Sequence, residues 1–520
     1  MLRVLQSRVF GSTKTGARMY SNLASATGRI EDQASVVQEN NGLPFEDIPG
    51  PPRVPLWGNL LQYKLRVYDW RQYHKVLCQL HTKYGPIVRE DLGPYNTVIH
   101  LFDPDDARAV YATEGRSPII KPLQETVKLY RQKKDKSPGL GNTNGEEWYR
   151  LRSAVRHLML QPREVSQYLP EVDDATNQFV SRIKSSLDSH GEVATLNEEV
   201  AKWSQESAGR ICFGKSLGCF SRGPEERELD NIIHTNREMF RLSAVLKFSL
   251  PIYKLFPTPL WQKVAKLEDI LVDYSERHVD KTVDEINELI KKGEPIPDRY
   301  SFMSHLIASK DLSRKDITIL TLSLFLDGLS TTVPMLLFNL YNLALHPEAQ
   351  EKLFSEVRHV LPDPETPITS KILGHLPYLK AFVKESFRTL PNGTDISRIL
   401  EKDLVLSGYK IPAGTHVNLN MLVNFKSEKY FPDPDKFLPE RWLRGDESQS
   451  VHPFVLTPFG HGTRTCAGRR FAEQDLYVFL TRIVRTFKVS YPHGAALDTV
   501  YDTLVFPKGP VRARFELRKS

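Results

Sequence analysis

The sequence predicts a mainly helical protein with a small β-rich part. Apolar residues recur at three- and four-residue intervals along five segments, which are residues 176–187, 226–246, 268–291, 315–346 and 347–361. Strand-like runs are short and sparse. The chain of 520 residues is longer than one average domain, but its Pro and Gly residues are spread out and no long Ser/Gly linker divides it. We therefore expect one large folded unit with subdomains.

The first 30 residues differ in charge from the rest of the chain. They contain no Asp or Glu, and they carry five of the basic residues that give the chain its net charge of +7, namely Arg3, Arg8, Lys14, Arg18 and Arg29. A Ser-containing, acid-free, Arg-punctuated leader is typical of a mitochondrial transit peptide. We expect this peptide over residues 1–20, with a boundary as late as about 30, and a flexible segment over 21–48. The alternative is a disordered tail without a targeting role.

The folded body is expected to begin near Pro49, in a proline-rich run that stiffens the chain. Four runs bounded by Pro or Gly predict strands that pair into small sheets at one side, and they are residues 87–92, 98–101, 404–411 and 511–517. The longest apolar stretch, residues 317–326, ends at Asp327 and is too short to span a membrane.

Several functional classes lack their usual sequence signals. The four cysteines form no CxxC pair and have no regular spacing, which excludes a disulfide framework and a zinc site and indicates a reducing compartment. No basic stripe remains outside the leader, so nucleic-acid binding has no support. The HExxH motif, the P-loop and the nucleophile elbow are all absent. The chemistry must therefore come from another group.

Cys466 is the strongest candidate for that group. It lies in a Gly-rich loop, residues 458–470, that leads into an apolar helical pattern over 471–487. Glycines let the backbone approach a flat ligand and direct N–H groups toward the sulfur. The helix start and the cationic Arg464 are expected to favour the thiolate, which would be a strong axial ligand. For a lone cysteine, the alternative is a small buried apolar side chain.

The loop Phe459-Gly-x-Gly-x-Arg464-x-Cys466-x-Gly is similar to the haem-binding loop of the cytochrome P-450 monooxygenases. The resemblance covers nearly all of residues 49–520, which are identified as a single catalytic domain with the cytochrome P-450 fold. It implies haem b as the cofactor, Cys466 as the axial ligand of its iron, and Phe459 as part of the haem-binding loop.

Other segments carry the same resemblance. Glu385-Ser-Phe-Arg388 matches the family's Glu-x-x-Arg helix, and Pro-Glu-Arg441-Trp matches its downstream segment. Together they imply a cluster of Glu385, Arg388 and Arg441. A buried carboxylate between two guanidiniums satisfies its lone pairs by charge-assisted hydrogen bonds, which would brace the cofactor loop.

The resemblance also implies partners for the haem propionates. Trp148 and Arg152 match the family's Trp-x-x-x-Arg helix and lie one turn apart on the same face. Arg398 and Arg464 occupy the positions of two further propionate partners. Outside this context, each arginine would be read as surface charge.

The segment at 327–332 departs from the family's Ala-Gly-x-Asp/Glu-Thr-Thr pattern. Asp327 replaces the Ala and Ser330 replaces the usual acid, whereas Thr331 keeps the hydroxyl that, in the family, helps to deliver protons during oxygen activation. Asp327 and Thr331 lie four residues apart on one helical face, so Asp327 is expected to supply protons through water or Thr331, with Ser330 as a relay. The alternative is that Asp327 only satisfies groups freed by a kink at Pro334.

The resemblance is closest to invertebrate members of the mitochondrial branch. Lys380 and Lys384 share one helical face, and in that branch matching lysines receive the acidic face of a small [2Fe–2S], adrenodoxin-like ferredoxin; the Arg469-Arg470 pair is also typical of the branch. A solvated lysine face is the alternative. The implied location is the matrix side of the inner membrane. An apolar surface over 248–261 is expected to contact the membrane or, alternatively, to pack on the core.

The resemblance implies a monooxygenase that inserts one atom of O₂ into a small lipophilic substrate, such as a sterol, a steroid or a xenobiotic. By position, residues 392–397, 326–331 and 504–506 should line the pocket, where Thr394 and Asp395 are expected to orient a polar end of the substrate. One alternative is a haem-thiolate isomerase or dehydratase that needs no external electrons, which the Ser330 departure permits. Another is a haem-bound sensor or carrier without turnover.

Overall fold

The structure is a computed structural model that describes residues 42–94, 96–443, 451–494 and 496–518. The expected transit peptide, its cleavage point and residues 21–41 of the expected flexible segment lie outside the described residues. Residues 42–48, which were placed in that segment, are folded here, since Leu43 forms a β-bridge with Tyr409 and Phe45–Asp47 forms a 3₁₀ helix. The body therefore begins several residues before the proline-rich run.

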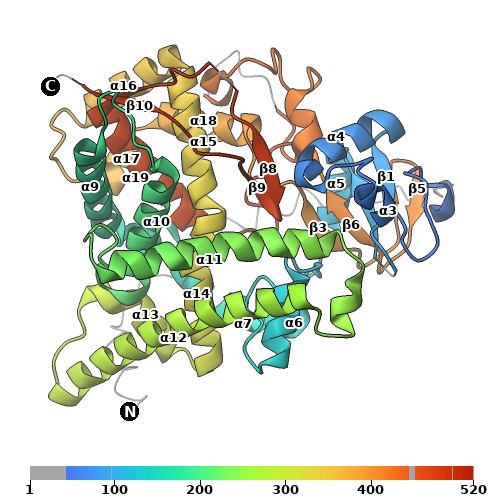
Figure 1. Cartoon of the computed structure of the whole chain (residues 1–520), viewed down its shortest axis with the longest axis horizontal. Coiled ribbons are helices and arrows are strands. Elements are labelled where there is room, and N and C mark those ends of the chain that lie inside the picture. The colour runs from blue at the N-terminus through green and yellow to red at the C-terminus, as the bar shows by residue number, and fades with distance from the viewer. Residues whose placement is uncertain (1–41, 95, 444–450, 495, 519–520) are drawn as a thin grey trace, which may run out of the picture.

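Helices build most of the molecule, and the chain is mainly α as predicted (Figure 1). All five segments with helical periodicity are helical, and most extend beyond the predicted limits because capping and packing residues continue them. The helices of the body are α3 Leu60–Lys64, α4 Tyr73–Tyr84, α5 Pro104–Ala112, α6 Glu125–Lys133, α7 Gly145–Leu160, α8 Pro162–Ser166, α9 Leu169–Ser186, α10 Leu196–Phe213, α11 Pro224–Lys247, α12 Pro259–Lys292, α13 Ser301–Ala308, α14 Arg314–Ser330, α15 Thr332–Leu345, α16 Pro347–Val360, α17 Ser370–Gly374, α18 Pro377–Thr389 and α19 Arg469–Thr486.

The helical segment over 315–346 is divided into α14 and α15, which confirms the distortion that Pro334 predicts. The break is at Thr331, whose backbone leaves helical geometry with φ −123° and ψ −63°. Its cause is Pro334, which has no N–H to donate to the carbonyl four residues earlier. Ser313 begins α14 with a capping box, in which its side chain and that of Asp316 each accept a hydrogen bond from the other's backbone N–H.

The strands form one sheet and three hairpin-like pairs. The sheet has the order β1-β2-β6-β3, in which β2 and β6 are parallel and the other neighbours are antiparallel. The pairs are β4 with β5, β8 with β9, and β7 with β10. The strands are β1 Ile87–Asp91, β2 Thr97–Leu101, β3 Ile396–Ile399, β4 Leu404–Leu406, β5 Tyr409–Ile411, β6 His416–Leu419, β7 Phe487–Ser490, β8 Thr499–Asp502, β9 Leu504–Pro507 and β10 Arg514–Leu517.

Two sequence expectations about strands need correction. The run at 404–411 is a hairpin rather than one strand, because Ser407 and Gly408 both take positive φ (46° and 85°) and turn the chain. The C-terminal run does not join the sheet side of the molecule: β10 pairs with β7 beside the helices, while the four-stranded sheet lies at the other end (Figure 1). Strands β3 and β6 were not predicted, since each has only four residues.

Helices α14 and α15 run through the centre of the larger hydrophobic core. Residues 314–345 are long and apolar enough, by length and composition, to cross a membrane, but 72% of the relevant window is buried inside the protein. Helix α10 packs against both halves, and α18 and α19 pack against α15. A smaller core lies beneath the four-stranded sheet. The break in the central helix is therefore held in place from several sides.

Candidate active site

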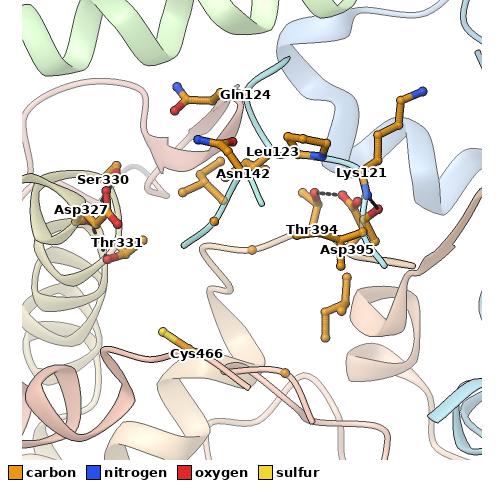
Figure 2. A pocket seen from close by; sticks show the side chains of 18 of the residues that line it. Lys121, Leu123, Gln124, Asn142, Asp327, Ser330, Thr331, Thr394, Asp395 and Cys466 are labelled. Carbon is orange, nitrogen blue, oxygen red and sulfur yellow. Dashed lines mark hydrogen bonds between the residues drawn. The ribbon is translucent and has the colours of Figure 1, made fainter. Parts of the chain in front are cut away.

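A cavity of about 1240 Å³ lies where the break between α14 and α15 faces the loop before α19. Its wall includes Cys466 from that loop and Asp327, Ser330 and Thr331 from the break. Figure 2 shows Cys466 on a different wall of the pocket from these three residues. Pockets for one small ligand usually have volumes of about 300–1,000 Å³, so this cavity has room for a large cofactor together with a second molecule.

The loop before α19 presents the Cys466 side chain to the cavity. Gly460 and Gly462 take positive φ (73° and 75°), which folds the loop back so that the N–H of Cys466 donates to the carbonyl of Phe459 at 2.8 Å. A Cβ on Gly468 would lie 4.0 Å from the Cys466 sulfur. The predicted direction of backbone N–H groups toward the sulfur fits this geometry, since the N–H groups of Gly468 and Arg469 hydrogen-bond to the Cys466 side chain.

The thiol is not activated in the way that the sequence suggested. Burial raises the pKa of Cys466, and the N–H of Gly468 opposes that shift. Arg464 was expected to favour the thiolate, but its guanidinium donates instead to the side-chain oxygen of Asn144 at 2.9 Å. Arg152 is the cation that lowers the pKa of the thiol. The fold by itself therefore favours the neutral thiol, and a metal ion bound to the sulfur would favour the thiolate.

The predicted propionate partners line one wall of the same cavity. Arg464 lies over the Trp148 ring, 4.5 Å from its centre, and Arg398 forms an ion pair with Glu114. Burial lowers the pKa of Arg464 to about 9, and the charges of Arg398 and Arg152 add to that lowering. Arg152 and Arg398 are buried and Arg464 is half-buried, so three guanidiniums with one nearby carboxylate leave an excess of positive charge. This excess fits the two propionates of a haem.

The break in the central helix exposes a carboxylate and a hydroxyl to the cavity. The hydroxyls of Thr331 and Ser330 both donate to the backbone carbonyl of Asp327, at 2.8 and 3.1 Å. The sequence predicted that Asp327 supplies protons through water or Thr331, with Ser330 as a relay. The structure directs the protons of both hydroxyls to the Asp327 carbonyl, so a link to the carboxylate needs a water molecule.

The Asp327 carboxyl group has a raised pKa. Burial raises it to about 7, Arg131 opposes the shift, and Glu268 adds to it. Arg131 and Glu268 form a buried ion pair at 2.7 Å. A carboxyl group with a pKa near neutrality both holds and releases a proton at physiological pH, which is the property that a proton donor needs.

Asn392 supports the break between α14 and α15, a role that the sequence did not predict. Its side-chain amide donates to the carbonyl of Ser330 at 3.2 Å and to the carbonyl of Val505 at 2.8 Å. The first is the carbonyl that Pro334 leaves without a helical partner. The sequence placed Asn392 in the pocket wall, but the contact joins segments 62 residues apart and no local pattern could reveal it.

The Glu385 cluster lies beside the cavity, not in it. Arg388 donates to both oxygens of Glu385, at 2.7 and 3.0 Å, and Arg441 donates at 3.1 Å. The structure adds two donors that the sequence did not indicate, the indole N–H of Trp442 at 2.8 Å and the backbone N–H of Leu438 at 2.9 Å. The carboxylate is fully buried and has several donors around it, as a bracing role requires.

The four residues assigned to a redox partner all lie at the surface. Lys384 is exposed and lies over the Trp442 ring, 4.1 Å from its centre, whereas Lys380 is half-buried. Arg469 and Arg470 are partly exposed, and both form ion pairs with Glu473, at 2.8 and 2.9 Å. The two arginines are therefore partly neutralised, and the lysines of α18 carry the less compensated charge.

The apolar segment at 248–261 is exposed in part. Ile252, Leu255 and Phe256 are 50%, 77% and 67% exposed. The lysines near this segment form specific contacts with other residues. Lys254 and Lys263 form ion pairs, and Lys247 points inward and donates to the hydroxyl of Tyr501 at 2.8 Å.

The fold is mainly helical, and a cysteine faces a large cavity opposite a broken central helix and beside buried arginines. This combination is typical of haem-thiolate proteins. The family model for cytochrome P450 matches residues 48–515. The chain belongs to the cytochrome P450 family, so it is a monooxygenase, an oxidoreductase that uses O₂ and binds haem through a cysteine thiolate.

Similar curated proteins cover nearly all of the chain. "Probable cytochrome P450 CYP44" of Caenorhabditis elegans is 43% identical over 91% of this chain and 94% of its own length. "Probable cytochrome P450 301a1, mitochondrial" of Drosophila melanogaster is 32% identical over 92% and 88%. "1,25-dihydroxyvitamin D(3) 24-hydroxylase, mitochondrial" of Rattus norvegicus is 31% identical over 91% and 89%.

Proposed function

We propose that the protein is a mitochondrial monooxygenase that inserts one oxygen atom into a sterol-like, steroid-like or xenobiotic substrate. Its two electrons come from a [2Fe–2S] ferredoxin of the adrenodoxin type. The observation that carries this proposal is the placement of Cys466 and Thr331 on separate walls of one large cavity, with room for a cofactor and a lipophilic molecule between them (Figure 2).

The residues of the cavity divide into two groups. Cys466 would ligate the haem iron, and Trp148, Arg152, Arg398 and Arg464 would hold the propionates. When bound, the haem would supply the activation of oxygen. The cavity walls would orient the haem and shield it from bulk water.

The second group moves protons. Asp327 holds a proton on its carboxyl group, because burial raises its pKa to about 7. The Thr331 hydroxyl donates to the Asp327 carbonyl, so its oxygen is free to accept a hydrogen bond from a water molecule in the cavity. The Ser330 hydroxyl donates to the same Asp327 carbonyl. We assign Asp327 as the proton source, with Thr331 and Ser330 as relays through water.

The electron donor and the location rest on surface charge and on the relatives. Lys380 and Lys384 on α18 provide a cationic face for an acidic ferredoxin, and Arg469 and Arg470 border the Cys466 loop. Four of the similar proteins are named as mitochondrial. We place the protein on the matrix side of the inner membrane, where the exposed side chains of Ile252, Leu255 and Phe256 give peripheral contact.

The first test is the spectrum of the reduced protein with carbon monoxide. Residues 21–520 are expressed, reduced and exposed to carbon monoxide, beside a Cys466→Ala variant. We expect a red-shifted, thiolate-type Soret band that the variant lacks. A folded protein without a haem signal would overturn the assignment of the cofactor site.

The second test separates a monooxygenase from an isomerase or dehydratase, the class that the serine at position 330 permits. Lipophilic substrates are incubated with reduced ferredoxin under ¹⁸O₂. We expect consumption of the reductant that depends on substrate, and one labelled oxygen atom in each product molecule. Product formed without reductant or label would favour the alternative class.

A further inference from the structure

One end of the cavity carries two lysine side chains among polar and apolar residues. Lys121 comes from the segment before α6, and Lys247 comes from the last residue of α11; both line the cavity that Cys466 faces. Figure 2 shows Lys121 beside Asp395 on one side of the pocket, and Asp327 on the opposite side. The cavity therefore has a basic end and an acidic end.

Lys247 has no ion-pair partner among the described residues. Its ammonium group donates to the Tyr501 hydroxyl at 2.8 Å and lies 4.9 Å from the centre of the Tyr73 ring. Burial acts to lower its pKa, but Tyr501 and Asp395 outweigh burial and raise the pKa above its ordinary value. Lys247 is therefore a cation that contacts neutral groups inside the protein.

Lys121 is also poorly compensated. Its ammonium group donates to the side-chain oxygen of Asn96, which is neutral, and lies 3.9 Å from the Glu125 carboxylate. That carboxylate is held more closely by Lys254, at 2.6 Å. Burial lowers the pKa of Lys121, and the charge of Lys247 adds to that lowering, so the two ammonium groups are close enough to repel each other.

His416 lies at the same end of the cavity. It lines the cavity and forms a hydrogen bond with the Ser397 hydroxyl at 3.0 Å. Burial lowers its pKa to about 3, and the charges of Lys121, His100 and Lys247 contribute to this shift. The imidazole is therefore neutral and adds no charge to this end.

Asp395 is the nearest acidic group, and it offsets this potential only in part. It accepts a hydrogen bond from the Thr394 hydroxyl at 2.5 Å and forms no ion pair with Lys121 or Lys247 in the described part of the chain. With Glu125 and Lys254 included, two carboxylates face three ammonium groups at this end of the cavity. An anion in this position would relieve the repulsion between the lysines and would form charge-assisted hydrogen bonds in a region of low dielectric constant.

We propose that Lys121 and Lys247 bind the carboxylate head of an amphipathic, lipophilic substrate whose apolar body extends toward Cys466. This inference rests on the proposed function and names the substrate class more closely, as lipophilic carboxylic acids. Neutral lipids of the same length lack the group that the lysines recognise. Cationic amphiphiles are repelled at this end.

The test measures the binding of three probes with the same alkyl chain to the haem-loaded protein. Equilibrium dialysis is carried out with dodecanoate, 1-dodecanol and dodecyltrimethylammonium, each below its critical micelle concentration. We expect dodecanoate to bind at least about tenfold more tightly than the other two probes, since hydrogen bonds to charged groups contribute about 1.5–3 kcal/mol, the equivalent of tenfold or more.

Variants assign the effect to the lysines. Lys247→Met keeps the apolar stem and removes the charge, and Lys121→Met does the same at the second position; each should weaken dodecanoate binding about tenfold. Asp395→Asn should strengthen it. The matched control is Lys263→Met, an exposed lysine outside the cavity lining that pairs with Glu238, and it should change the affinity less than about twofold.

The proposal is overturned if dodecanol binds as tightly as dodecanoate, or if neither lysine variant alters the affinity for dodecanoate. If Lys247→Met does not fold, as judged by its circular dichroism, Lys121→Met decides the question. Dialysis requires no turnover, so it separates this inference from the proposed function. Tight, lysine-dependent binding without oxygen insertion would refute the monooxygenase substrate assignment but not the carboxylate subsite.

Discussion

The side-chain amide of Asn392 donates a hydrogen bond of 3.2 Å to the carbonyl of Ser330, at the break between α14 and α15. The same amide reaches Val505 in β9, and the N–H of Val505 donates back to the carbonyl of Asn392. One side chain thus ties the segment after α18 and the C-terminal hairpin to the central helix. The opened turn that carries Thr331 is held by tertiary contacts as well as by Pro334.

Asn392→Ala should destabilise the protein by about 2–4 kcal/mol, because it leaves two buried carbonyls unpaired at about 1–3 kcal/mol each. Urea unfolding of the haem-loaded protein measures the change. Gln167→Ala, which removes an exposed contact to the Glu164 carbonyl, is the matched control and should have little effect. Equal stability of the two variants would show that the amide does not support the break.

Asp327→Asn should uncouple electron use from product formation. The variant keeps the shape of the side chain but cannot release a proton, so product per reductant should fall at least about tenfold, within the range usual for proton donors. The measurement compares reductant consumed with product formed. Ser323→Ala, which changes another cavity-facing residue of α14, is the control and should stay coupled. Full coupling in Asp327→Asn would end the relay assignment.

The raised pKa of Asp327 also predicts a pH dependence of stability. In the folded protein its pKa is about 7, against an ordinary value of 3.8, so the folded state binds this proton more tightly than the unfolded state. The stabilisation is complete below about pH 4 and is lost as the pH rises through about 7. Relative to Asp327→Asn, the wild-type protein should therefore lose stability between pH 5 and about 7 and change little above.

Urea unfolding at several pH values, monitored by tryptophan fluorescence, measures that difference. Asp435→Asn removes an exposed carboxylate and serves as the control, with no comparable trend. If the stability difference between wild type and Asp327→Asn stayed constant from pH 5 to 8, the carboxyl group would not have a raised pKa in the folded protein.

Glu385→Ala should be strongly destabilising, by about 3–5 kcal/mol, because it leaves the guanidiniums of Arg388 and Arg441 buried without their anion. Thermal unfolding and the fraction of protein that retains haem report the loss. Glu288→Ala, which removes an exposed helical ion pair with Lys291, is the control and should cause no measurable change. A stable Glu385→Ala variant with full haem content would contradict a bracing role.

Reversing the charge of Lys384 should weaken the interaction with ferredoxin. We expect Lys384→Glu to raise the KM for ferredoxin about tenfold and Lys380→Glu to raise it less, with both effects shrinking at high salt. Lys292→Glu, at the end of α12, is the matched surface control. Ferredoxin kinetics that were the same for Lys384→Glu and Lys292→Glu would remove α18 from the docking face.

Local sequence patterns were informative where the physical cause is local. The helical periodicity, the glycines around Cys466 and the proline that opens the central helix all act within a few residues. Short strands such as β3 and β6 were not predictable, because four residues carry little pattern and their pairing joins segments far apart in the chain. The hairpin at Ser407 was missed because a non-glycine residue takes positive φ there.

The sequence alone was enough to recognise the motif around Cys466 that resembles a haem-binding loop. The thiol, the glycines and the following helix are contiguous, so the covalent chain fixes their spacing. Tertiary structure decided the electrostatics around it. Arg464 turns away from the thiol, Lys247 turns inward, and the pKa of Asp327 rises to about 7. These outcomes depend on burial and on neighbours supplied by distant segments, and the charge of a side chain has no defined environment until the chain has folded.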